Sequence, residues 1–183
     1  MEQKSTFWRS AMVYGLYVGI ALTLFSVILY VTGQTQNKVL GYLAIPIYIA
    51  AIAVSQINYR NRDLDGVMSY GQGVGFAAAL MIFSGIITAL YTLILYKIDP
   101  GLVEQIKNLQ EQKMAAKGMS EDQIDAAMQV ASKFMTPGIM AISSLFGSVI
   151  MGTVVGLVTS IFTQKKGNPD AFDDAMEEIK TEE

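Results

Sequence analysis

The hydrophobic residues of the chain gather into four long stretches, at about residues 10–32, 40–57, 68–96 and 137–163. A helix needs roughly 20 mainly apolar residues to cross the hydrocarbon core of a bilayer, and all but the second stretch exceed that length. The second contains Pro46, which removes a backbone donor and predicts a kink near the start of its helix. The pattern therefore predicts an all-α protein, an integral membrane four-helix bundle.

The segment between the third and fourth stretches, about residues 99–133, places its apolar side chains at helical spacing. Asp99 and Pro100 have the order of a helix cap followed by a proline, and Gly118 suits a helix stop. The run Ser120–Gln123 has the spacing of a capping box for a second helix. We therefore expect an extramembrane helical hairpin here.

The apolar faces of this hairpin have several alternative partners. They could dock on each other, lie on the lipid headgroups, or form a site for another protein. We favour a hairpin that docks like a lid over the bundle. Pro137 and Gly138 then predict a bend where the chain re-enters the membrane.

Small residues recur every four positions in the fourth stretch, so they form a furrow along one face of a helix. Helices in lipid associate through close backbone approach, which small residues permit. The first and third stretches carry similar ladders, and the spacing G-x-x-x-G occurs in all of these stretches. The predicted helix-packing positions are Gly15, Gly19, Gly71, Gly75, Ser148, Gly152 and Gly156. We interpret them as seams within one bundle, and the alternative is a seam with a second copy or another membrane protein.

Residues 14–19, Tyr-Gly-Leu-Tyr-Val-Gly, resemble residues 70–75, Tyr-Gly-Gln-Gly-Val-Gly. A duplicated two-helix unit would produce such a match, as a parallel repeat. We favour chance similarity between glycine-rich helices, because the second and fourth stretches match poorly.

The composition narrows the chemistry that the chain can perform. Hydrophobic residues make up 52% of the 183 residues and charged residues only 16%, which is more apolar than an ordinary soluble domain. The chain has neither cysteine nor histidine, and hence no thiolate nucleophile and no imidazole base. The four stretches contain no charged residue, whereas proton relays and voltage sensors need one. We therefore expect no enzyme activity, no catalytic residue, no cofactor and no metal site.

Basic residues flank three stretch ends that share one side of the membrane in a four-span topology: Lys4 and Arg9, Arg60 and Arg62, and Lys165 and Lys166. Because Lys and Arg concentrate on the cytoplasmic side, we expect both termini in the cytoplasm. The charged link 58–66 could also bind anionic headgroups or a partner, but a topology signal is our preferred interpretation. Residues 167–183 form an acidic cytoplasmic tail, which we expect to be solvated, with protein docking as the alternative.

One further pattern suggests a family. The charged run Arg60–Asp65, followed by Gly66 and then by Ser69-Tyr70-Gly71-Gln72, resembles an uncharacterised bacterial family of short four-helix inner-membrane proteins, assigned to a domain of unknown function. The resemblance covers about residues 7–166. It implies topology and compartment, and it carries over no catalytic or binding residue.

Taken together, these patterns predict a multi-pass protein of the bacterial inner membrane with no enzymatic activity. The expected function is that of an accessory or assembly module, packing with a second copy of itself or with a membrane protein partner. The alternative is a small transporter or channel lined by Tyr, Ser and Thr instead of charges. The expected partners are the lipid bilayer and such a protein, and we expect no nucleic acid partner.

Overall fold

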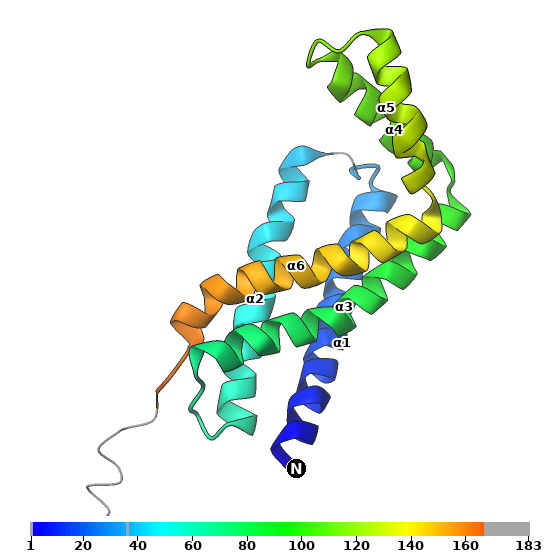
Figure 1. The fold of residues 1–183 in the computed structure, drawn as a ribbon. Helices are drawn as coiled ribbons and strands as arrows, with labels where there is room; N and C mark the ends of the chain where they lie inside the picture. The colour runs from blue at the N-terminus through cyan, green and yellow to red at the C-terminus, as the bar shows by residue number, and fades with distance from the viewer. Residues whose placement is uncertain (1, 36, 167–183) are drawn as a thin grey trace, which may run out of the picture.

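The structure, a computed structural model, describes the backbone of residues 2–35 and 37–166, and the side chains of the same residues apart from 2–5 and 38. Within these residues it contains the helices α1 (Glu2–Val31), α2 (Lys38–Asp63), α3 (Tyr70–Ile98), α4 (Gly101–Ala115), α5 (Glu121–Phe134) and α6 (Pro137–Thr163). Figure 1 shows the four long helices crossing one another, with α4 and α5 set apart at one end. The acidic tail that the sequence predicts at 167–183 lies outside the described residues.

The long helices are long and apolar enough to cross a membrane, over Thr6–Val31, Val39–Asp63, Tyr70–Ile98 and Pro137–Thr163. Their outward surfaces are covered with large exposed apolar side chains, as a lipid-facing surface requires. The predicted fold class, an all-α membrane bundle with a helical hairpin between the third and fourth spans, is confirmed. These features identify a multi-pass membrane protein.

The second span is longer than the sequence suggested, because α2 continues through the charged link to Asp63. Two side chains past residue 57 explain the continuation. The ring of Tyr59 stacks on Phe76 of α3 with centroids 4.0 Å apart. Arg60 donates from Nη1 to the Thr163 carbonyl at 2.8 Å. The chain therefore turns only at Asp65 and Gly66, which both have positive φ.

Local capping explains where the helices begin. Ser69 and Gln72 form a capping box at the start of α3. Ser120 and Gln123 form the predicted capping box at the start of α5, which is confirmed. Thr136 caps α6, and its Oγ1 accepts a hydrogen bond from the Ile139 N–H at 3.4 Å.

Two predictions at the turns around the hairpin had different outcomes. The predicted stop at Gly118 is confirmed, with φ of +81° just after α4. The predicted cap by Asp99 is wrong, because Pro100 occupies the cap position without a side-chain hydrogen bond. The Asp99 carboxylate instead accepts a hydrogen bond from the Tyr30 hydroxyl at 3.1 Å, which ties the end of α1 to the end of α3.

Helix α3 is the central element of the bundle, because it makes extensive contacts with α6 on one face and with α1 on the other. Helix α2 touches α6 and α1 over smaller areas. The buried core lies towards the end of the bundle that carries the α2–α3 turn, where Ile52, Phe76 and Leu80 are fully buried.

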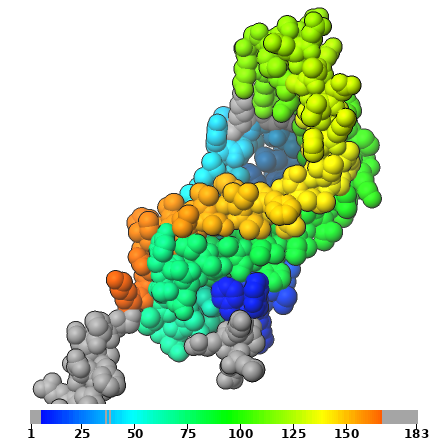
Figure 2. All heavy atoms as spheres, in the orientation of Figure 1, coloured from blue at the N-terminus to red at the C-terminus, as the bar shows by residue number. Residues whose placement is uncertain are grey.

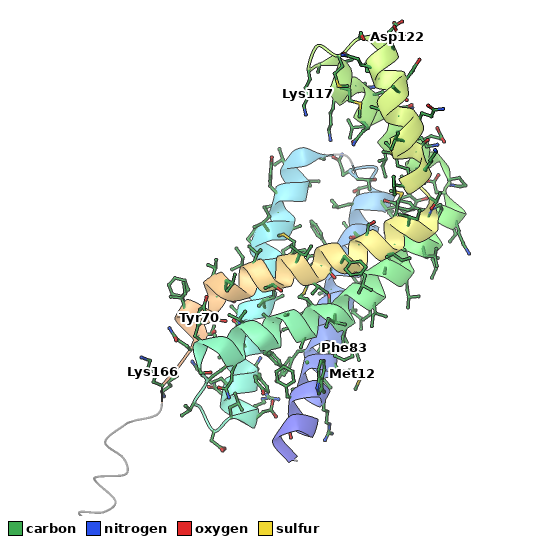
Figure 3. The ribbon with its side chains drawn as sticks, in the orientation of Figure 1. Met12, Tyr70, Phe83, Lys117, Asp122 and Lys166 are labelled. Atoms are coloured by element: carbon green, nitrogen blue, oxygen red, sulfur yellow. The ribbon has the colours of Figure 1, made fainter. Side chains whose placement is uncertain are left out.

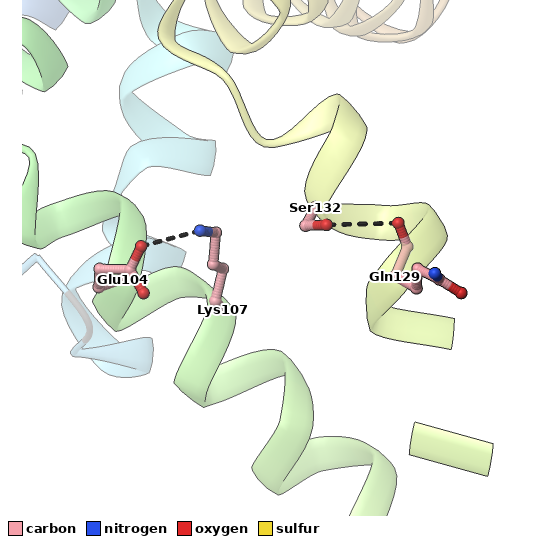
Figure 4. Close-up of polar contacts among 4 residues, drawn as sticks. All are labelled: Glu104, Lys107, Gln129 and Ser132. Atoms are coloured by element: carbon pink, nitrogen blue, oxygen red, sulfur yellow. Dashed lines mark hydrogen bonds and ion pairs between the residues drawn. The ribbon is translucent and has the colours of Figure 1, made fainter. Parts of the chain in front are cut away.

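The hairpin of α4 and α5 folds on itself, with Leu102, Val103 and Met128 as its buried residues. Figure 1 shows it projecting beyond the ends of α3 and α6. Its polar contacts in Figure 4 lie within single helices: Lys107 to Glu104 at 2.8 Å, and the Ser132 hydroxyl to the Gln129 carbonyl at 3.3 Å. The predicted lid over the bundle is therefore wrong, because α4 and α5 contact each other and project away from the bundle.

Candidate functional site

The closest seam of the bundle joins α3 and α6, and it has a regular antiparallel register. A Cβ built on Gly156 would lie 2.6 Å from Cβ of Ala77, and one built on Gly152 would lie 2.6 Å from Cβ of Met81. One turn further along, the Ser148 hydroxyl occupies the space where Gly85 has no Cβ. The predicted positions Ser148, Gly152 and Gly156 thus all face α3.

A second seam joins α1 and α3 through Gly15 and Gly19. A Cβ on Gly15 would lie 2.7 Å from Cβ of Phe83, and one on Gly19 would lie 2.8 Å from Cδ1 of Ile87. Figure 3 shows Phe83 at the point where α3 crosses α1. The absence of side chains at these glycines lets the helix backbones approach each other.

The predicted positions Gly71 and Gly75 lie elsewhere, on the open side of α3. No atom lies within 4 Å of the place where either glycine would carry a Cβ. They therefore line no seam between the described helices. Their places in the seam with α6 are taken by Gly73 and Gly85, whose missing side chains leave room for Ser160 and Ser148.

The end of the bundle that carries the α2–α3 turn is closed by a buried polar cluster. Gln56 of α2 donates from Nε2 to the Gly73 carbonyl at 3.0 Å and to the Ser160 hydroxyl at 2.9 Å. Its Oε1 accepts from the Thr163 hydroxyl at 3.1 Å. Because Gln56 and Ser160 are fully buried, these bonds replace water and join α2, α3 and α6.

Backbone pairing fastens the same end. The N–H of Met68 donates to the Lys165 carbonyl and the N–H of Lys165 donates to the Met68 carbonyl, both at 2.9 Å. This pair holds the residues before α3 against the residues after α6. The lower half of the bundle in Figure 1 is therefore tightly closed.

The other half of the bundle contains a cavity of about 440 Å³ between all four spans. Figure 2 shows the hollow between the blue, cyan and yellow segments, beneath the hairpin. Among the residues whose side chains are described, its walls combine apolar side chains with hydroxyl groups and include no charged group. The hydroxyl-bearing residues of the lining are Ser26, Thr35, Tyr48, Thr88, Tyr91, Thr92, Tyr96, Ser144 and Ser148.

Several of these hydroxyls donate to carbonyls of their own helices. Thr92 donates to the Thr88 carbonyl at 2.8 Å, and Ser144 to the Ala141 carbonyl at 2.7 Å. Their donor is thereby used, and their oxygen lone pairs remain as acceptors. The hydroxyl of Tyr91 is buried without a hydrogen-bond partner among the described residues. A buried hydroxyl without a partner costs free energy that a bound polar molecule could recover.

This lining restricts what the cavity can do. A volume of about 440 Å³ lies within the range of small-molecule sites, roughly 300–1,000 Å³. Hydroxyls at ordinary pH neither give up nor take a proton readily, so the walls offer hydrogen bonds and apolar contact but no general acid or base. The cavity suits an uncharged molecule with an apolar body and hydrogen-bonding groups.

The sequence revealed the residue types of this cavity but not the cavity itself. The Ser and Thr residues of the spans have no charged residue beside them in the sequence. Their spacing therefore did not indicate that they line one cavity. Gln56 was visible as a polar residue in an apolar stretch, which is the signal that points to a buried contact between helices.

Comparison with known proteins identifies a family but no characterised relative. No curated protein and no solved structure matches the chain. The model of a family described as a protein of unknown function, DUF4199, matches residues 13–165, which include most of the first span, the other three spans and the hairpin. The chain therefore belongs to this family of unknown function.

Proposed function

We propose that the protein is a non-enzymatic accessory or assembly module of the bacterial inner membrane, and that its α4–α5 hairpin is the part offered to a partner. The observation that carries this proposal is the position of the hairpin. The hairpin folds on itself, projects beyond the spans, and leaves Val130 and Phe134 exposed by 58% and 62%. A folded element that covers nothing in its own chain is free to contact another protein.

The proposed orientation places both termini in the cytoplasm and the hairpin on the opposite side. The supporting pattern is the distribution of positive charge. Arg9, Arg62 and Lys166 flank the ends of α1, α2 and α6 at one face of the bundle. Figure 3 shows Lys117 and Asp122 at the far end of the molecule from Lys166. The hairpin residues mix both signs, so the excess of Lys and Arg favours the other face as cytoplasmic.

Site-specific photocrosslinking from the hairpin tests the partner role. A photoreactive residue in place of Val130 should give one discrete protein adduct in native membranes. The matched control is Phe162, which is 80% exposed on the lipid-facing side of α6 and should give none. The mass of the adduct shows whether the crosslinked partner is a second copy of the chain or a different protein. Equal adducts at both positions, or none at Val130, would contradict the proposal.

The cavity favours a second candidate function, a small transporter or channel for uncharged solutes. It lies between all four spans, is lined by hydroxyls, and is closed towards the Gln56 cluster. A space that reaches only one half of the membrane is the arrangement expected of one state in an alternating-access cycle.

Solute flux into vesicles that carry the purified protein tests this candidate. Gly147 lines the cavity and has no atom within 4 Å of a built Cβ, so Gly147→Trp places an indole in the cavity without displacing a helix. Gly75→Trp, on the open side of α3, is the matched control. A transporter would lose flux in the first variant and keep it in the second. Absence of flux for every uncharged solute tried with the unaltered chain would exclude this function.

A further inference from the structure

A second, charged cavity lies at the membrane surface between the first turns of α1 and the last turns of α2. Its volume is about 420 Å³. The lining residues are Thr6, Arg9, Ser10, Val13, Tyr14, Arg62 and Asp63. It is separate from the hydroxyl-lined cavity, which lies at the opposite end of the same helices.

The charged groups of this cavity do not neutralise one another. Neither Arg9 nor Arg62 makes a hydrogen bond or ion pair with another residue that the structure describes. The Asp63 carboxylate accepts one hydrogen bond through Oδ2, from the Ser10 hydroxyl at 2.9 Å. Its other oxygen has no hydrogen-bond partner among the described residues. Two guanidinium groups and a carboxylate oxygen thus line one space without an ionic partner among the described side chains, an arrangement that suits a ligand carrying both signs of charge.

An apolar groove of about 620 Å³ continues from this cavity along the outer surface of α1 and α2. Tyr14 lines both spaces. The groove is otherwise lined by Tyr17, Val18, Ala21, Ile47, Ala50, Ala51, Val54, Ser55 and Asn58.

Helical periodicity places the lining residues of the cavity and of the groove along one stripe of each helix. On α1, the shared stripe runs from Arg9 and Ser10 through Tyr14 to Ala21 in steps of three and four residues. On α2, the same spacing leads from Arg62 back to Ile47. The part of α2 that lines the groove, from Ile47 to Asn58, is about 16 Å long at a rise of 1.5 Å per residue. That length is close to one leaflet, because the whole hydrocarbon core is roughly 30 Å thick.

We propose that this surface is a binding site for a phospholipid whose headgroup carries a primary ammonium beside its phosphate, a phosphatidylethanolamine. The phosphate lies between Arg9 and Arg62, the ammonium donates to the free oxygen of Asp63, and one acyl chain occupies the groove. The groove faces hydrocarbon, where lipid is the surrounding solvent. The paired charges at its end select among lipids.

The choice of a phosphatidylethanolamine headgroup follows from the charges of the three ionised side chains in the cavity. A purely anionic headgroup would satisfy the guanidinium groups but would place Asp63 beside negative charge, which is unfavourable. A phosphatidylcholine headgroup carries both charges, but its quaternary ammonium has no N–H to donate to the carboxylate. A phosphate with a neighbouring ammonium complements all three groups in both charge and hydrogen bonding.

Thermal unfolding of the purified full chain in detergent tests the site. Phosphatidylethanolamine, phosphatidylcholine and phosphatidylglycerol with identical acyl chains are added in parallel. A ligand that binds the folded state raises the melting temperature in a concentration-dependent way. We expect phosphatidylethanolamine to give the largest rise. Equal rises for all three lipids would overturn the proposal.

Variants that remove the charged side chains test whether the stabilising lipid binds in this cavity. Replacing both guanidinium groups, in Arg9→Gln with Arg62→Gln, should weaken the apparent affinity for phosphatidylethanolamine about tenfold or more, because a charged hydrogen-bonding pair is lost. The matched control replaces the basic pair after α6, in Lys165→Gln with Lys166→Gln, and should change nothing. An unchanged affinity in the Arg9 and Arg62 variant would contradict the proposal.

Two further variants test the site without removing the guanidinium groups. Asp63→Asn keeps an acceptor for Ser10 but removes the negative charge, so the preference for phosphatidylethanolamine over phosphatidylglycerol should vanish. Ala50→Phe fills the groove and should abolish stabilisation by the lipid. Glycerophosphoethanolamine, which has the headgroup and no acyl chain, should not stabilise the protein. If it stabilises as well as the lipid does, the site binds a soluble phosphate ester and the proposed occupant is wrong.

Discussion

Gly156 of α6 faces Ala77 of α3 so closely that a Cβ on the glycine would lie 2.6 Å from Cβ of the alanine. The contact repeats along the seam at steps of four residues, with Gly152 against Met81 and Ser148 against Gly85. Because the lipid around the bundle is as apolar as the helix surfaces, close packing and interhelical hydrogen bonds must hold these helices together.

Gly156→Ala should therefore destabilise the bundle. The added methyl group must push α6 away from α3, and overpacking of this kind costs about 1–3 kcal/mol. Gly75→Ala is the matched control on α3, because nothing lies within 4 Å of its Cβ position and alanine is the better helix former. Thermal unfolding in detergent should show a lower melting temperature for the first variant and an equal or slightly higher one for the second. Similar losses in both would contradict the close seam.

The buried cluster around Gln56 predicts a second loss of stability. Gln56→Leu removes the bonds of the amide to the Gly73 carbonyl and to the hydroxyls of Ser160 and Thr163, and a buried polar group left unsatisfied costs about 1–3 kcal/mol. The control is Thr153→Val, whose hydroxyl bonds the Val149 carbonyl of its own helix at 2.9 Å. The free energy of unfolding should fall in the leucine variant and stay within about 0.5 kcal/mol in the valine variant. An equal effect of the two would show that the cluster does not join the helices.

Access of water to the hydroxyl-lined cavity can be measured by thiol labelling, since the chain contains no cysteine of its own. Ser144→Cys places a thiol in the cavity wall, Ser160→Cys in the closed half, and Val154→Cys on the lipid-facing surface. A water-soluble maleimide should react fast with the first variant and slowly with the other two. Equal rates at positions 144 and 154 would mean that the cavity holds no water.

The sequence predicted the helical segments and the α6 side of the main seam because both depend on spacing within one segment. Apolar runs longer than a bilayer crossing define spans wherever they occur. Ser148, Gly152 and Gly156 were recognisable because small residues at intervals of four lie on one face of a helix.

The matching face of α3 was not predictable in the same way. Gly71 and Gly75 share one face of the helix, whereas Gly73, two residues from each, lies on another face. Which side meets α6 depends on the partner, and the buried Ser160 and Gln56 select Gly73. The docking of the hairpin was mispredicted and the cavity was missed, for a related reason. Both depend on how separate helices are placed: α5, in which Met128 is buried, contacts α4.

The most direct test of four membrane crossings compares two single-cysteine variants in intact cells. Gln110→Cys lies on α4 of the hairpin, and Asn61→Cys lies near the end of α2, where it is exposed. An impermeant maleimide added outside should label position 110 without disruption of the inner membrane, and position 61 only after disruption. Labelling of both positions from the same side would mean that the number of crossings between them is even, which contradicts a single passage through α3.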